Sequence, residues 1–112
     1  MATKTAASNW RRANDPSVLI LTSLAEGAKH GYALSKDIET FAHVVLSPGT
    51  LYGAITRLER SGLIAPEPEI DRRRPYRLTA AGSAALTEFV TEMSRLVQVG
   101  STRLSATGWA TA

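Results

Sequence analysis

Apolar residues recur along the chain at the three- and four-residue spacing of helices. Residues 17–24 are apolar nearly all round, which predicts a buried helix. Residues 32–41 and 48–60 carry apolar positions on one side and polar positions on the other. A last apolar stripe lies within residues 80–104 and covers about two and a half heptads. The pattern therefore predicts one buried helix and three amphipathic ones.

Residues that cap helices stand at the predicted starts. Asp15 and Ser47 each precede a proline, and a side-chain oxygen followed by proline at the first helical position is a common helix start. Thr79 stands in the same place before the last stripe. Gly27 and Gly62 follow the first and third stretches, where glycine often ends a helix.

Two short segments, 63–65 and 76–79, alternate apolar and polar residues as paired strands do. Residues 66–75 between them are rich in proline and charge, which is typical of an exposed hairpin tip. The pattern leaves the pairing register open, because Pro66 and Pro68 have no N–H to donate to a ladder. We expect a small β-hairpin here.

The order helix, helix, helix, hairpin, helix is that of a winged helix-turn-helix. The expected fold is mainly α with a small β-hairpin, with a winged helix-turn-helix DNA-binding domain over 15–79 and a C-terminal dimerisation helix over 80–104. We expect a flexible arm over 1–14 and a flexible tail over 105–112. Trp10 is the exception in the arm, because a large aromatic side chain usually packs onto something.

The composition is that of one globular domain. The 112 residues are 44% hydrophobic and 21% charged, which excludes a chain kept unfolded by its charge. The absence of cysteine excludes disulfides, thiolate zinc sites, iron–sulfur clusters and cysteine nucleophiles. The first residues show no apolar segment typical of a secretion signal, and no run approaches the length of a membrane span. We therefore expect a cytoplasmic protein with no membrane contact.

The residue pattern does not favour an enzyme. His30 and His43 are separated by a whole predicted helix and have no third ligand at a useful spacing, so we expect no metal site. The sequence shows no convincing catalytic triad, carboxylate pair or phosphate-binding glycine loop. We therefore expect no cofactor and a function that depends on binding.

The net charge of +3 and the pI near 9.7 are compatible with nucleic-acid binding without requiring it. Helix 48–60 would be the recognition helix, whose N-terminal side chains usually reach base edges in the major groove. Its outer face begins with small residues, which permit a close approach of the DNA backbone, and Arg57 follows them. The three arginines 72–74 at the hairpin tip are placed to reach the adjacent minor groove or its phosphates.

Motifs in four successive parts of the chain resemble those of the PadR family of transcriptional regulators. These motifs are His30-Gly31-Tyr32, Leu46-Ser47-Pro48-Gly49-Thr50-Leu51-Tyr52, Arg57-Leu58-Glu59-Arg60-Ser61-Gly62-Leu63-Ile64 and Arg74-Pro75-Tyr76-Arg77-Leu78-Thr79-Ala80-Ala81-Gly82. The resemblance covers residues 17–92, and the single C-terminal helix is similar to the shorter subfamily. It implies a winged-helix regulator, usually a homodimeric repressor, whose DNA binding is in some members relieved by phenolic or drug-like aromatic effectors, sometimes from a pocket at the dimer interface.

Two positions depart from the family pattern. Gly53 stands where the family commonly has proline, and because glycine inside a helix costs about 1 kcal/mol relative to alanine, close approach of DNA and mere drift are both open explanations. Pro75 stands where the family often has an aromatic residue, so contacts of that aromatic do not transfer to this chain. We interpret Gly31 and Gly49 as residues that the backbone conformation requires rather than as direct contacts to DNA.

The candidate DNA contacts combine the outer face of helix 48–60, two tyrosines and the hairpin arginines. Tyr52 matches a family position that donates its hydroxyl to a phosphate; the alternative is a half-buried tyrosine that packs on the wing. Ser47 is primarily an N-cap, and contact with DNA would be an additional role. For Tyr32 the alternative to a DNA contact is packing in the core. For the arginines the alternative is a run of charges exposed to solvent. The full candidate set is Tyr32, Ser47, Thr50, Tyr52, Gly53, Thr56, Arg57, Arg72, Arg73 and Arg74.

The C-terminal stripe covers either the core of its own domain or a second copy of the chain. We favour a dimer, because so small a domain has few other helices to bury so long a stripe. Two-fold symmetry would then place two recognition helices ~34 Å apart, one turn of DNA. The candidate interface residues are Leu86, Phe89, Val90, Met93, Leu96 and Val97. The candidate effector-pocket residues, for which core or interface filling is the alternative, are Trp10, Phe89, Met93 and Trp109.

Taken from sequence, the expected function is that of a sequence-specific, double-stranded-DNA-binding transcriptional regulator, a homodimeric repressor relieved by a small aromatic or hydrophobic effector. The alternative is a winged-helix protein-interaction module that does not itself bind DNA, which the modest basic excess leaves open.

Overall fold

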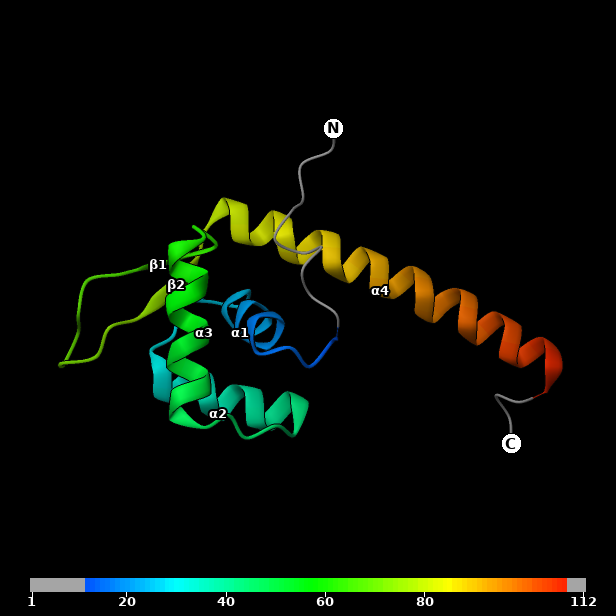
Figure 1. The fold of residues 1–112 in the computed structure, drawn as a ribbon, viewed down its shortest axis with the longest axis horizontal. Helices are drawn as coiled ribbons and strands as arrows, with labels where there is room; N and C mark the ends of the chain where they lie inside the picture. The colour runs from blue at the N-terminus through cyan, green and yellow to red at the C-terminus, as the bar shows by residue number, and fades with distance from the viewer. Residues whose placement is uncertain (1–11, 109–112) are drawn as a thin grey trace.

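The computed structural model describes residues 12–108, which form a helical body with a two-stranded hairpin at one end and a long helix leaving it (Figure 1). The fold is a winged helix-turn-helix followed by a long C-terminal helix. Its elements are α1 (Pro16–Leu24), α2 (Gly31–Ala42), α3 (Pro48–Arg60), β1 (Ile64–Pro66), β2 (Tyr76–Leu78) and α4 (Ala80–Thr107).

The predicted caps are confirmed. The Asp15 carboxylate accepts from the Ser17 N–H at 2.9 Å, and the Thr79 hydroxyl accepts from the Gly82 N–H at 3.0 Å. One cap was not predicted: Nδ1 of His30 accepts from the Ala33 N–H at 3.4 Å, so α2 begins at Gly31, one residue earlier than expected. The helix also ends one residue later, at Ala42.

The core lies around α1, which contacts α2, α3, α4 and β2. Ile20 and Leu21 of α1 are completely buried, as the apolar pattern of that helix predicts. Leu34 and Ile38 of α2 meet them from one side. The α3 side chains that join this cluster are Leu51, Ala54, Ile55 and Leu58. Because burying one such aliphatic side chain stabilises a protein by about 1.5–3 kcal/mol, this cluster fixes the orientation of α3 against the body.

The hairpin register, which the sequence left open, is Ile64 opposite Leu78 and Pro66 opposite Tyr76. The first strand begins one residue later and ends one residue later than predicted, and the second ends at Leu78. Thr79 lies outside the strand, and its hydroxyl caps α4. Its N–H donates to the Leu63 carbonyl at 3.1 Å.

The hairpin tip is a tight turn. Ile70 and Arg73 exchange two backbone hydrogen bonds, both of 2.8 Å. Asp71 and Arg72 between them have φ values of 51° and 64°. Positive φ at both central residues is the signature of a type I′ turn, which matches the twist of the strands that it joins.

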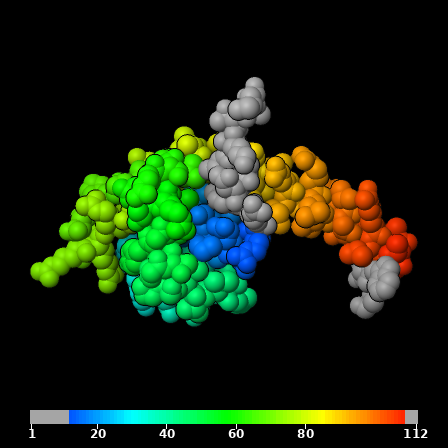
Figure 2. All heavy atoms as spheres, viewed as in Figure 1, coloured from blue at the N-terminus to red at the C-terminus, as the bar shows by residue number. Residues whose placement is uncertain are grey.

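The long helix α4 has 28 residues, which corresponds to about 42 Å at the usual helical rise. Its first half packs on the body, whereas its second half projects from it (Figure 2). The helix continues to Thr107 and ends at Gly108, whose φ of 82° suits glycine. The predicted helix end at 104 is therefore wrong, and residues 105–107 are not part of a tail.

Two candidate interface residues face inward instead. Leu86 is 9% exposed and belongs to the main core, and Phe89 is 6% exposed and packs with Val18. The first turns of the stripe thus cover the core of the chain's own domain. For these turns the alternative to a dimer contact is correct. Trp10 and Trp109 lie outside the described residues.

Gly82 allows α4 to cross the start of the hairpin. A Cβ at this position would overlap the carbonyl oxygen of Leu63 and lie 2.9 Å from a methyl group of Leu78. Only glycine fits here, although no positive φ marks the position. None of the helices in the described part of the chain is both long and apolar enough to cross a bilayer.

Candidate nucleic-acid interface

The outward face of α3 is exposed to solvent. Its inward positions are buried in the core, and the helical period therefore turns Thr50, Tyr52, Thr56 and Arg57 toward solvent, where all of them are exposed. The small residues at the start of the helix leave its first turn open. These exposed positions are the ones predicted to meet DNA.

Hydrogen bonds at the start of α3 decide which polar groups are available. The Ser47 hydroxyl accepts from the Thr50 N–H at 3.2 Å and donates to the Thr50 hydroxyl oxygen at 2.9 Å. Thr50 therefore keeps its own hydroxyl hydrogen, whereas Ser47 uses its hydrogen within the cap. The Thr56 hydroxyl donates back to the Tyr52 carbonyl at 2.9 Å, so Thr56 presents its methyl group and an acceptor rather than a donor.

No contact within the described chain requires glycine at position 53. A Cβ there would lie 3.6 Å from Nη1 of Arg57, an ordinary van der Waals distance. The helical φ of this residue is also open to alanine. Packing inside the protein therefore does not explain Gly53. The two explanations, close approach of DNA and drift, both stay open.

A pocket joins three separate parts of the chain beside this face. It has a volume of about 300 Å³. Its walls come from the start of α2, from α3 and from the hairpin. The lining residues are His30, Gly31, Tyr32, Tyr52, Arg72, Arg73, Arg74 and Tyr76. Five predicted DNA contacts, namely Tyr32, Tyr52 and the three arginines, thus share one concave site.

The chemistry of this pocket is that of an anion site. The first N–H groups of a helix have no partner within the helix, and the start of α2 therefore supplies donors and the positive end of a helix dipole. Tyr52 is half-exposed, and its hydroxyl reaches the backbone of Gly31. The three hairpin arginines also line the pocket, and guanidinium groups pair well with phosphate oxygens.

The hairpin arginines differ in what they already contact. Nη1 of Arg74 donates to the Glu67 carbonyl at 3.1 Å, across the hairpin. Nη1 of Arg73 lies 3.4 Å from Nε2 of His30, the residue that caps α2. Arg72 stands at the tip in the left-handed conformation. The ion pairs formed within residues 12–108 involve Lys29 and leave these three charges available to a ligand.

Tyr76 closes the pocket from β2. Burial raises the pKa of its hydroxyl above the usual value, and the nearby carboxylate of Glu59 acts in the same direction, while Arg74 opposes them. The hydroxyl therefore stays protonated at neutral pH and is able to donate a hydrogen bond. Tyr76 and His30 are not among the site residues predicted from the sequence; their only signal there is a place inside the family motifs.

The remaining predicted contacts lie outside the pocket. Ser47, Thr50, Gly53, Thr56 and Arg57 follow the length of α3. The structure therefore divides the candidate set into a helix face and a concave site next to it. Among residues 12–108, no three histidine or carboxylate side chains lie close enough together to hold a metal ion.

A second, apolar groove of about 430 Å³ lies between α1 and α4, on a different surface. Its lining residues are Ala13, Val18, Thr22, Phe89, Val90, Met93, Ser94, Val97 and Gln98. Beyond the groove, Leu96 is 66% exposed and Leu104 is 49% exposed on the projecting half of α4. The predicted effector residues Phe89 and Met93 are both in this groove.

Comparison with known proteins agrees with this architecture. Residues 20–88 match the transcriptional regulator PadR-like family. The chain is 38% identical over 95 residues to the transcriptional regulator Rv3488 of Mycobacterium tuberculosis, covering 80% of this chain and 88% of that protein. It is 45% identical over 85 residues, 76% of its length, to an uncharacterized 37.1 kDa protein in transposon TN4556 of Streptomyces fradiae, of which it spans only 25%.

A solved structure of another transcriptional regulator has a similar fold. A transcriptional regulator from Clostridium thermocellum is similar at 31% identity with a TM-score of 0.66, covering 78% of this chain and 87% of that one. The family match spans the predicted DNA-binding helices and the hairpin. The chain belongs to the PadR-like family of DNA-binding transcriptional regulators.

Proposed function

We propose that this protein binds a specific double-stranded DNA sequence as a homodimer in the cytoplasm and represses transcription from that site. The observation that carries the proposal is the pocket in which the start of α2, Tyr52 of α3 and the hairpin arginines meet, beside the outward face of α3. A helix to read bases and an adjoining site for phosphate are the two parts that DNA recognition needs.

In this proposal α3 enters the major groove. Thr50 offers a free donor hydrogen, Thr56 offers a methyl group for thymine, and Arg57 is positioned for guanine or a phosphate. Gly49 and Gly53 have no side chain on the surface of α3, so the DNA backbone approaches the helix closely there. The main role of Ser47 is to cap α3, where its hydroxyl accepts from the Thr50 N–H. Contact with DNA is an additional role.

The pocket holds a backbone phosphate. The donors around it are the N–H groups of Gly31 and Tyr32, the hydroxyls of Tyr52 and Tyr76, and the guanidinium of Arg73. Arg72 at the tip reaches further along the groove. Phosphate contacts of this kind fix the position of a protein on the duplex, and they leave base reading to α3.

The dimer forms through the second half of α4. Val90, Leu96 and Val97 are at least half-exposed, and they continue the apolar stripe beyond the body. A second copy packed against this stripe would remove it from water, which the chain's own domain does not do. Leu86 and Phe89 support the interface from within the core instead of contacting the partner.

An effector site follows from the groove between α1 and α4. In a dimer the partner helix would close this groove into an apolar cavity, whose volume of about 430 Å³ suits one small aromatic or hydrophobic molecule. Phe89 and Met93 would contact that molecule. Occupation would shift α4 relative to α1, and the spacing of the two α3 helices with it, which releases DNA.

The test is a gel-shift titration against DNA from the protein's own promoter region at several salt concentrations. Specific binding that weakens steeply with salt is expected, because phosphate contacts release counterions. Arg57→Ala should weaken binding, whereas the matched variant Arg95→Ala, which removes the same charge from α4, should not. Equal effects of the two variants would refute the role of Arg57.

Absence of any specific site in a genome-wide selection would overturn the proposal as a whole. A stoichiometric protein partner in a pull-down, together with absent DNA binding, would favour the interaction module instead.

A further inference from the structure

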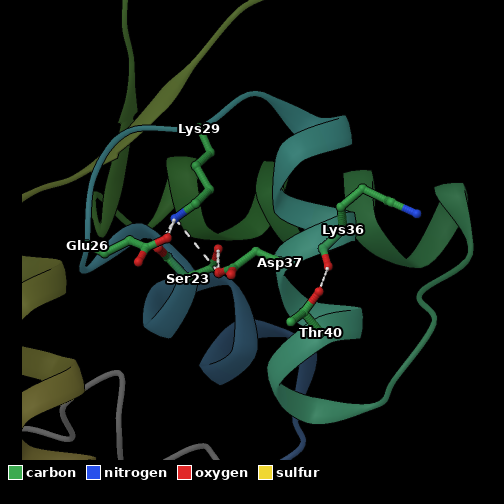
Figure 3. A network of polar contacts seen from close by, with 6 residues as sticks. All are labelled: Ser23, Glu26, Lys29, Lys36, Asp37 and Thr40. Carbon is green, nitrogen blue, oxygen red and sulfur yellow. Dashed lines mark hydrogen bonds and ion pairs between the residues drawn. The ribbon is translucent and has the colours of Figure 1, made fainter.

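Lys29, in the connection between α1 and α2, is the centre of a polar cluster outside the DNA site (Figure 3). Its ammonium group donates to the Ser23 carbonyl and lies 2.9 Å from the Glu26 carboxylate and 3.8 Å from Oδ2 of Asp37. The side chain is only 14% exposed. A lysine head group is rarely so covered, because removing its charge from water costs several kcal/mol unless partners replace the lost hydration.

The partners of Lys29 are themselves held in place. Ser23, at the end of α1, is buried, and its hydroxyl donates to Oδ2 of Asp37 at 2.6 Å. Asp37 belongs to the second turn of α2. Two of the three oxygens around the ammonium, those of Ser23 and Glu26, are at hydrogen-bond distance, and Oδ2 of Asp37 adds an ion pair at 3.8 Å, so the charge is directed into the protein. The cluster thus links the end of α1 to α2 through one lysine.

The backbone of Lys29 is hydrogen-bonded to the hairpin. The Lys29 N–H donates to the Tyr76 carbonyl at 3.1 Å, and the Tyr76 N–H donates to the Lys29 carbonyl at 2.9 Å. Lys29 therefore acts as a one-residue third strand beside β2. The next residue, His30, caps α2 and lies against Arg73. The hairpin is thus attached through Tyr76 to a residue whose side chain is fixed on two helices.

We propose that Lys29 is a positioning residue for DNA binding, which acts through the hairpin and not by contact with DNA. It fixes β2 against the start of α2, and so it sets the distance between the arginines on one wall of the anion pocket and Tyr52 on the other. The inference rests on the proposed function, because it concerns how that site is assembled. Neither the family motif nor the charge of Lys29 indicates this role, since the motif begins at His30.

The test compares two variants that remove one positive charge each. Lys29→Met keeps the aliphatic stem and loses the ammonium, and Lys36→Met removes an exposed ammonium of α2 that points away from the cluster. Affinity for the promoter DNA of the gel-shift test should fall about tenfold in Lys29→Met, the effect of one lost charge-assisted hydrogen bond to phosphate. It should change little in Lys36→Met. Circular dichroism and thermal melting show which variants are folded at the binding temperature.

A second readout separates positioning from stability. The slope of log affinity against log salt should decrease by about one in Lys29→Met, because a phosphate contact of the hairpin is lost although Lys29 touches no DNA. In a chain that already carries Arg72→Ala, Arg73→Ala and Arg74→Ala, adding Lys29→Met should change the affinity less than twofold. Loss of folding stability alone would not produce this dependence on the arginines.

Equal loss of affinity with and without the three arginines, or equal effects of Lys29→Met and Lys36→Met, would overturn the inference. If Lys29→Met does not fold, Lys29→Gln takes its place, because it keeps a polar head group and loses the charge that pairs with Glu26 and Asp37. An unchanged affinity and salt slope in the folded variant would also overturn the inference. Wild-type protein that binds no DNA would instead refute the proposed function itself.

Discussion

The hydroxyl of Tyr52 in α3 lies against the backbone of Gly31 at the start of α2. A Cβ on Gly31 would overlap that hydroxyl and come within 2.9 Å of the ring carbon that carries it. The glycine therefore makes room for the tyrosine and places a phenolic donor next to the free N–H groups of a helix N-terminus. Two motifs that are separate in the sequence form one wall of the anion pocket by this contact.

Gly31→Ala should weaken DNA binding about tenfold, because the new methyl group displaces the Tyr52 hydroxyl from the pocket. The cost in folding stability should be only about 1 kcal/mol, since the displaced atoms are the end of a half-exposed side chain that is able to rotate away. Binding titrations and thermal melting measure the two effects. In a Tyr52→Ala background the same substitution should leave affinity unchanged; a further loss there would contradict the account.

Arg72→Gly should stabilise the fold and weaken binding at once. A non-glycine residue at a φ of 64° carries a steric cost of roughly 1–2 kcal/mol, which glycine removes from the tip of the hairpin. The substitution also deletes a cation proposed to meet phosphate, so the salt slope should fall by about one. Denaturant unfolding and salt-dependent gel shifts report the two quantities separately. Unchanged affinity would remove Arg72 from the DNA site.

Gly53→Ala discriminates between the two explanations for glycine in the middle of α3. The new methyl group meets only the Arg57 side chain at 3.6 Å, so the helix should gain about 1 kcal/mol in stability. If the DNA backbone approaches this position, as proposed, affinity should fall about tenfold while stability rises. A more stable variant with unchanged affinity would show that the glycine has no role in contact.

Gly82→Ala should destabilise the protein by about 3 kcal/mol, because its methyl group would meet the backbone carbonyl of Leu63 rather than a movable side chain. Gly53→Ala is the matched control, since it adds the same atom to another helix where space exists. Chemical unfolding of both variants gives the comparison. A Gly82→Ala protein as stable as the wild type would mean that α4 crosses the hairpin differently.

Leu96→Glu combined with Val97→Glu should convert the proposed dimer to a monomer, because two carboxylates would be buried in the contact between copies. Thr91→Glu places one carboxylate on the opposite side of α4 and should leave the proposed dimer intact. Light scattering at several concentrations measures the outcome, and DNA affinity should fall with dimerisation. A wild-type protein that is monomeric at working concentrations would refute the dimer.

For α4 the apolar pattern predicts the helix correctly but not which of its residues are buried or where it ends. The stripe from Leu86 onward is a real helical face, but the sequence does not say what covers each turn of it. The body takes Leu86 and Phe89 into its own core, while Leu96 stays exposed. Residues 105–107, which carry no apolar period, remain helical because they continue an existing helix, for which adding one residue is far easier than starting a new one.

The sequence by itself determined the elements, since helix starts at Asp15, Ser47 and Thr79 depend on a side-chain oxygen only a few residues from the N–H that it accepts. Periodicity likewise marked the outward face of α3. The tertiary structure alone decided the pocket, because Gly31, Tyr52 and the hairpin arginines are brought together by packing around α1. The roles of Lys29 and Gly82 depend in the same way on atoms distant along the chain, and a local pattern carries no signal of such contacts.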